Sequence, residues 1–245
     1  PAVLCLGFYT SVRVAEQEIF ISRPFAPTRR VALGESNLPS HPSPGAGGLL
    51  LAGVVAHFSD RIHPDLLDEQ LHLITQLESG QRITQPRLRH RFQTDRIGLQ
   101  RCYHQLSVVD DRLQFDIDDH TGTAEQHVLC ALYAAAQLPM ADRRGVFGAI
   151  RVGLRWPGDV DAGFAALVTG RRNGSQLSAL ADPETWARNL LGFDADGELT
   201  RRAVQVSFRR LVTEAHPDHG GATIGAAGRI SDLSEARRVL LATTG

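Results

Sequence analysis

The sequence has no lysine, few cysteines and almost no net charge. The low net charge and the small number of cysteines each exclude a class of protein. Its 26 basic residues are all arginines and are balanced by 27 acidic residues, which leaves a formal net charge of -1. Without an excess of one sign, no overall field draws the chain to nucleic acid or to an anionic membrane. The cysteines, Cys5, Cys102 and Cys130, are too few and too dispersed for a disulfide framework, and no pair has metal-ligand spacing. We therefore expect a reducing compartment.

Long hydrophobic runs are lacking too. The longest apolar run, GAGGLLLAGVVAHF, is shorter than the roughly 20 residues that span a bilayer, so it predicts a buried helix. Residues 1–30 do not have the charged and then apolar pattern of a signal peptide. We expect a cytoplasmic location, with membrane association only if an anchor precedes Pro1, because the sequence begins without a methionine.

Breakers and periodic patterns divide the chain into three parts. An N-terminal segment and linker, 1–45, contains weakly alternating stretches that are typical of short strands, followed by the breaker-rich NLPSHPSPGAGG. From residue 46 to residue 173, apolar residues at helical spacing predict helices that pack as one bundle. A different helical pattern occupies residues 182–245. The expected fold is therefore mainly α, with a short β segment at the N-terminus.

The middle part contains a repeated helix–loop–helix pattern. LLAGVVAHFSDRIHPDLLDEQLHLITQL and LCALYAAAQLPMADRRGVFGAIRVGL share one scheme, an apolar helix, a short polar loop and a second apolar helix. VVAHFSDRIHPDLLDEQ resembles the loop and proline-led helix of the tellurite-resistance TerB domain, and MADRRGVFGAIRVGL resembles its second copy. The resemblance implies a TerB-like helical domain over residues 46–173. Because Arg61 stands where the loop glycine is usual, acidic-loop metal binding is not expected.

The tripeptide His-Pro-Asp occurs twice, in different contexts. At residues 63–65 it opens a helix, where proline suits the first turn and the acidic residues suit the helix dipole, so local chemistry explains this copy. The second copy, His216, Pro217 and Asp218, is called the HPD tip below. It follows a basic amphipathic pattern and precedes two glycines. Proline restrains the backbone there, so Asp218 is presented for a charge-assisted bond with a partner arginine.

The residues around the HPD tip predict two antiparallel helices. DPETWARNLLGFDADG indicates a short helix that begins at Asp182 and Pro183 and ends at Gly192. ELTRRAVQVSFRRLVTEA then predicts a helix that Thr200 caps, with an apolar stripe on one face. Four arginines project elsewhere on that helix: Arg201, Arg202, Arg209 and Arg210. RISDLSEARRVLL forms a second stripe after the tip.

Residues 182–245 resemble the J domain of DnaJ-type co-chaperones. The resemblance rests on the order and spacing of LLGF, FRRLVTEAHPD and ISDLSEARRVLL. The resemblance implies that the HPD tip contacts an Hsp70 and stimulates its ATP hydrolysis, and that the four arginines dock there. A TerB-like domain followed by a J domain is also similar to the membrane-anchored DjlA co-chaperones. The two resemblances together imply a non-enzymatic Hsp70 co-chaperone without cofactor or metal, whose TerB-like domain provides localisation or client choice. Ala215 and Arg237 stand where aromatic residues are usual in J domains.

Three other interpretations stay open. The stretch 81–104 carries six arginines and one aspartate, so 82–101 is a candidate nucleic-acid or anionic-partner surface. Asp116, Asp118 and His120 offer ligands for a hard cation if they share one strand face. A metal-dependent hydrolase would use His216, Asp218 and His219, but the sequence shows no set of residues that completes such a site.

Overall fold

The computed structural model describes residues 11–26, 28–110, 112–170, 182–215 and 226–244. The chain divides into two compact units. The first unit comprises residues 1–40 and 44–169, and the second comprises residues 41–43 and 170–245. Within the described ranges, no helix combines the length and the apolar character needed to cross a bilayer.

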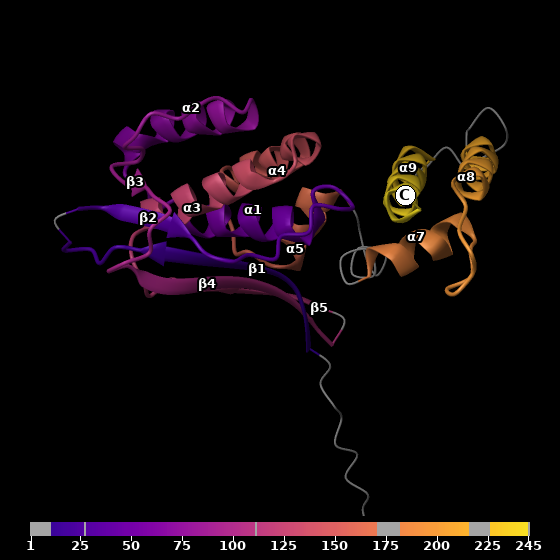
Figure 1. The fold of residues 1–245 in the computed structure, drawn as a ribbon, viewed down its shortest axis with the longest axis horizontal. Coiled ribbons are helices and arrows are strands. Elements are labelled where there is room, and N and C mark those ends of the chain that lie inside the picture. The colour runs from indigo at the N-terminus through magenta and orange to yellow at the C-terminus, as the bar shows by residue number, and fades with distance from the viewer. Residues whose placement is uncertain (1–10, 27, 111, 171–181, 216–225, 245) are drawn as a thin grey trace, which may run out of the picture. The chain divides into compact units, whose positions relative to one another are not determined.

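The first unit is built on a mixed sheet of five strands in the order β3-β2-β1-β4-β5 (Figure 1). The long central strands β1 and β4 are antiparallel, β2 and β5 flank them antiparallel, and β3 is parallel to β2. A bulge between Arg13 and Ala15 shifts the register of β1 on β4. The strand bounds are β1 Ser11–Ile21, β2 Arg30–Leu33, β3 Arg91–Phe92, β4 Gln100–Val109 and β5 Arg112–Ile117.

The expectation of a mainly α fold is therefore wrong, because this sheet makes the fold mixed α/β. The error concerns β4 and β5 above all, which lie inside the region expected to be a helical bundle. In β4 the alternate residues Cys102, His104, Leu106 and Val108 are buried, as expected for a strand with one covered face. Their neighbours are polar and partly basic, so the region's composition suggested a charged surface and concealed the period of two.

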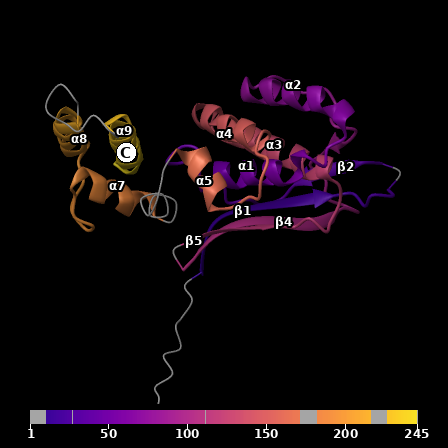
Figure 2. The ribbon, with the colours of Figure 1, turned by 180° about the vertical axis from the view of Figure 1, so that it is seen from behind.

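Helices cover one face of the sheet in two layers. The helix α1, Gly45–Ser59, is buried along most of its length and contacts β1 and β4 below it and α4, Met140–Gly153, above it. Beside α1, the helix α3, Ala124–Gln137, rests on β1 and β2. The helix α2, Leu67–Glu78, contacts α3 and α4 in the outer layer, and α5, Ala162–Thr169, packs against α1 and β5. Figure 2 shows the same layers from behind.

The first His-Pro-Asp copy is a helix start, as the sequence predicts. Its Pro64 and Asp65 begin the short 3-10 helix η1, Pro64–Leu66, directly before α2. His63 is its N-cap, and the His63 Nδ1 atom accepts a hydrogen bond of 3.3 Å from the backbone nitrogen of Asp65. The tripeptide therefore serves local backbone hydrogen bonding at this site.

The second unit contains three described helices, α7 Pro183–Leu191, α8 Arg201–Ala215 and α9 Ala226–Thr243. Their boundaries follow the local signals in the sequence. The Asp182 carboxylate accepts a hydrogen bond of 3.0 Å from the Thr185 amide, and Gly192 ends α7 with a φ of 76°. The three helices share a core made of Trp186, Ala187, Leu191, Val204, Ala215, Leu233, Ala236, Val239 and Leu240.

Candidate functional site

The predicted HPD tip lies outside the described residues, but the helices on both sides of it are described. The helices α7, α8 and α9 contact one another in every pairing. In Figure 1, the last turn of α8 and the first turn of α9 lie on the same side of this unit. Ala215, the residue directly before the tip, is buried in the shared core. The chain therefore enters the tip from a packed position.

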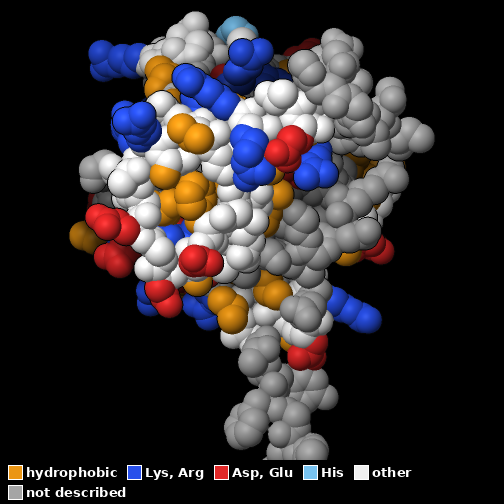
Figure 3. All heavy atoms as spheres, turned by 90° about the vertical axis from the view of Figure 1, so that its right-hand side faces the viewer, with side chains coloured by type: hydrophobic (Ala, Val, Ile, Leu, Met, Phe, Trp, Pro, Cys, Tyr) orange, Lys and Arg blue, Asp and Glu red, His pale blue; other side chains and the backbone are white. Residues whose placement is uncertain are grey.

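One face of α8 is packed and another is basic. Val204 and Ala215 are buried in the shared core, whereas the α8 arginines, Arg201, Arg202, Arg209 and Arg210, are exposed. Figure 3 draws the right-hand side of the view in Figure 1, and basic side chains lie in its upper part with acidic ones among and below them. Arg210 forms an exposed ion pair of 3.0 Å with Glu214, one turn on, and such pairs contribute little to stability.

The turn between α7 and α8 is tied down by side chains from both helices. The Arg188 guanidinium donates hydrogen bonds to the backbone oxygens of Asp194, at 3.1 Å, and Gly197, at 2.9 Å. The Ser207 hydroxyl donates a hydrogen bond of 2.6 Å to the backbone oxygen of Leu191. These bonds set the direction of α8 relative to α7, and hence the direction in which the α8 arginines project.

A separate polar cluster lies inside the first unit. Among the described residues, the side chains of Cys102, His104 and His127 form one group whose ligating atoms all lie within 4.8 Å of one another. All three residues are buried; Cys102 and His104 come from β4 and His127 comes from α3. The His104 Nε2 atom lies 3.0 Å from Nδ1 of His127. The ring of Phe58, on α1, stacks on the His127 ring with centroids 4.2 Å apart.

Burial controls the protonation of this cluster. Desolvation lowers the pKa of His104 to about 3 and that of His127 to about 4, so both rings are neutral near pH 7. Burial also raises the pKa of the Cys102 thiol, which donates a hydrogen bond to the Asp118 carboxylate. His104 Nδ1 has no hydrogen-bond partner among the described residues.

The sequence did not predict this cluster. Cys102 and His104 are two residues apart, which places both on one face of a strand, and that spacing was the available signal. His127 joins them only because α3 packs on the sheet. The candidate cation ligands Asp116, Asp118 and His120 do not form a site of this kind. Asp116 is exposed, and the His120 ring is 94% exposed and pairs with Asp119.

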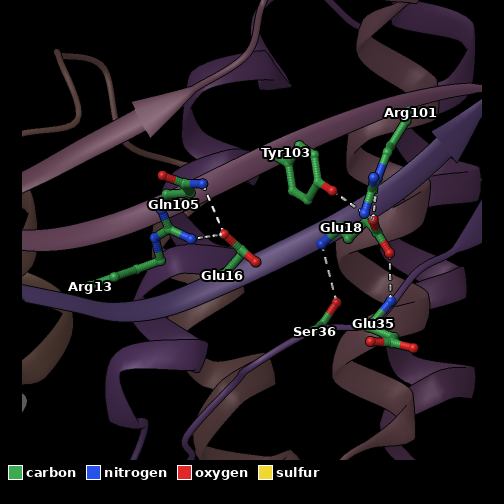
Figure 4. Close-up of polar contacts among 8 residues, drawn as sticks. All are labelled: Arg13, Glu16, Glu18, Glu35, Ser36, Arg101, Tyr103 and Gln105. Carbon is green, nitrogen blue, oxygen red and sulfur yellow. Dashed lines mark hydrogen bonds and ion pairs between the residues drawn. The ribbon is translucent and has the colours of Figure 1, made fainter.

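On the uncovered face of the sheet, Glu18 of β1 forms the centre of a polar network (Figure 4). The Glu18 side chain is only 4% exposed. Its carboxylate accepts hydrogen bonds of 2.8 Å from the Tyr103 hydroxyl and from the Glu35 amide, and it also pairs with Arg101. Burial opposes ionisation, but these hydrogen bonds outweigh it and hold the Glu18 pKa below its ordinary value. With its oxygens bonded in this way, the carboxylate serves to hold β1, β4 and the segment after β2 together.

The arginines of the candidate surface 82–101 are partly engaged within the first unit. Arg101 pairs with Glu18, and Arg87 lies 3.7 Å from the Glu69 carboxylate. The Arg96 guanidinium lies over the Phe20 ring, 5.0 Å from its centroid. These contacts divide the arginines among separate internal partners.

Comparisons of the chain with protein-family models, curated proteins and solved structures found no match.

Proposed function

We propose that the chain is an Hsp70 co-chaperone whose second unit presents the HPD tip to an Hsp70 and stimulates its ATP hydrolysis. The observation that carries the proposal is the packing of the two helices that flank the tip. The helices α8 and α9 share one buried core, and Ala215 is part of it. Because the flanking helices are already packed together in the free chain, binding does not have to order them, which favours recognition by a partner.

The exposed basic face of α8 supports the same proposal. The α8 arginines lie on the helix that leads directly into the tip, so one partner can contact both. Residues 183–245 contain eight arginines and eight acidic residues, so long-range attraction to an acidic partner is weak. Recognition therefore depends on short-range contacts of the tip and of these arginines.

In this proposal the first unit provides localisation or client choice, and the chain itself performs no catalysis. It acts in the cytoplasm, and at a membrane only where an anchor holds it there. The helical layers and open sheet face of the first unit are distinct from the helices that flank the tip. Localisation or client choice is therefore assigned to one unit of the chain and Hsp70 stimulation to the other.

The experiment that tests the proposal measures the steady-state ATPase rate of a cognate Hsp70 with and without the full chain. Asp218→Asn is expected to reduce the stimulated rate to the basal rate, because the tip loses its carboxylate charge. The matched control is Asp65→Asn, which makes the same chemical change in the other tripeptide, where the side chain is 74% exposed.

The control variant is expected to stimulate as well as the unaltered chain does. Circular dichroism spectra of both variants show whether the helices are retained. An unaltered chain that fails to stimulate the Hsp70, or an equal loss from Asp65→Asn and Asp218→Asn, contradicts the proposal.

A further inference from the structure

We propose that Cys102, His104 and His127 form a binding site for a thiophilic divalent cation of the zinc type in the core of the first unit. The site holds β4 to α3, and it is independent of the Hsp70 function proposed above. The three residues supply two imidazole nitrogens and one sulfur, the ligand types that zinc prefers in proteins.

The spacing of the ligating atoms is close to that of a tetrahedral site. Zinc–nitrogen bonds of about 2.0–2.1 Å place two imidazole nitrogens about 3.3 Å apart in a tetrahedron. The distance from His104 Nε2 to His127 Nδ1 is 3.0 Å. The sulfur lies within 4.8 Å of the nitrogens, so it reaches a shared ion by a shift on the order of 1 Å.

The protonation of His127 leaves its Nδ1 atom unprotonated and able to bind a cation. Its Nε2 atom lies 2.5 Å from the backbone oxygen of Thr121. A carbonyl oxygen only accepts hydrogen bonds, so Nε2 carries the proton and Nδ1 presents its lone pair toward His104. Metal-bound histidines commonly donate their second N–H to a carbonyl or carboxylate in this way, which fixes the ring.

Asp118 completes the charge balance of the site. Its carboxylate accepts the hydrogen bond from the Cys102 thiol, and its negative charge acts on both histidines. When a cation binds, the thiol releases its proton to solvent and the sulfur coordinates as thiolate. One divalent cation, one thiolate, one carboxylate and two neutral imidazoles together carry no net charge, which suits a buried site.

Without a cation, one hydrogen bond between the two imidazole rings holds the cluster together. The His104 ring is fully buried, and its hydrogen bond to His127 is the one bond recorded for it within the described residues. When a cation binds, the His104 proton moves from Nε2 to Nδ1, and the one hydrogen bond between the rings is replaced by bonds from the ion to all three side chains. Three protein ligands leave the fourth position of a tetrahedral zinc ion to Asp118 or to a water molecule. Because all three ligands are buried, a substrate has no access to the ion, and the site is structural rather than catalytic.

The test uses the full chain, unfolded and refolded with Zn²⁺ or Co²⁺, because a buried site fills as the chain folds. After removal of free metal, elemental analysis is expected to find about one zinc per chain. The Co²⁺ form is expected to show the near-ultraviolet absorption of thiolate–cobalt charge transfer. A refolded unaltered chain that retains no zinc and lacks this absorption overturns the proposal.

Two matched pairs of variants locate the site. Cys102→Ser is expected to abolish the charge-transfer band, whereas Cys130→Ser, which removes the other buried cysteine that the structure describes, is expected to keep it. His127→Gln is expected to weaken zinc binding by about 100-fold or more, whereas His90→Gln, at a buried histidine outside the cluster, is expected to leave it unchanged. A band that survives Cys102→Ser contradicts the site, as does equal zinc loss in the two histidine variants.

Discussion

The guanidinium of Arg237, on α9, lies over the ring of Phe208, on α8, with its Cζ atom 4.8 Å from the ring centroid. Arg237 stands at a position where the J-domain resemblance leads one to expect an aromatic residue. The cation–π contact joins α8 and α9 on the surface of the shared core, so an arginine here still contributes to holding the two helices together. Its aliphatic stem adds packing against the same ring.

Arg237→Ala is expected to destabilise the pairing of α8 and α9. Loss of an exposed cation–π contact costs about 0.5–1 kcal/mol, so backbone amides of both helices should exchange with solvent several-fold faster. Hydrogen exchange measured by mass spectrometry on the full chain provides the readout. Arg229→Ala, which removes an exposed arginine from the same helix, serves as the control. Equal acceleration in both variants would show that the contact with Phe208 is unimportant.

Under the proposed function, the double variant Arg201→Gln, Arg202→Gln is expected to weaken the stimulation of Hsp70 without abolishing it. Loss of these two exposed charges is expected to raise the concentration of the chain needed for half-maximal ATPase stimulation by about 3- to 10-fold. The difference should shrink as salt is added, because screening removes surface attraction. The control is Arg82→Gln, Arg144→Gln, the same charge change at exposed sites of the first unit. If the control weakens stimulation as strongly, net charge rather than the α8 surface is responsible.

Substitution by alanine is expected to have opposite effects on the free energy of unfolding at two glycines of α4. A Cβ atom at Gly153 would lie 2.4 Å from the Ala52 backbone oxygen of α1, so Gly153→Ala forces the helices apart at a cost of about 1–3 kcal/mol. At Gly148 nothing lies within 4 Å of the added atom. Gly148→Ala is therefore expected to stabilise the chain by about 0.5–1 kcal/mol through helix propensity. Urea unfolding checks both values, and a neutral Gly153→Ala would exclude the close approach of α1 and α4.

The stability of the first unit is expected to depend on pH through Glu18. Its hydrogen bonds lower the folded-state pKa below the ordinary 4.5. A carboxyl group with a lowered pKa stabilises the fold fully above its unfolded pKa and loses that contribution as the pH falls through the folded-state pKa. Glu18→Gln should therefore be less stable than the unaltered chain at pH 7, and the difference should narrow below about pH 4.5.

Urea unfolding over a series of pH values measures this difference. Glu35→Gln is the control, since Glu35 contributes its backbone amide to the network while its side chain is exposed. A difference between Glu18→Gln and the unaltered chain that stays constant down to about pH 3 would mean that Glu18 ionisation does not stabilise the fold.

Much of the second unit could be predicted because its signals are local. Asp182 and Pro183 mark the start of α7, Gly192 marks its end, and Thr200 accepts a hydrogen bond of 3.2 Å from the Ala203 amide at the start of α8. Each of these signals acts over three or four residues, so a linear pattern contains it completely. The HPD tip itself remains a prediction from the sequence, because it lies outside the described residues.

The sheet could not be predicted in the same way. The pairing of β1 with β4 joins Glu18 to Tyr103 across more than 80 intervening positions, and nothing near either residue indicates the other. Strand pairing is decided by which hydrophobic faces are buried together, and that depends on the packing of α1 and α3 over the sheet. The polar residues of β4 then dominated the local composition and made a buried strand resemble a charged surface.

The sequence by itself determined where α7 begins and ends and where α8 begins, that the first His-Pro-Asp opens a helix, and that the apolar run GAGGLLLAGVVAHF is a buried helix. These properties follow from capping, backbone restraint and hydrophobicity, which act between neighbours. Only the tertiary structure decided that Cys102 and His104 meet His127, and that Glu18 meets Arg101. Such contacts form when a strand and a distant element dock, because the free energy of burying their apolar faces together brings in whatever polar side chains those faces carry.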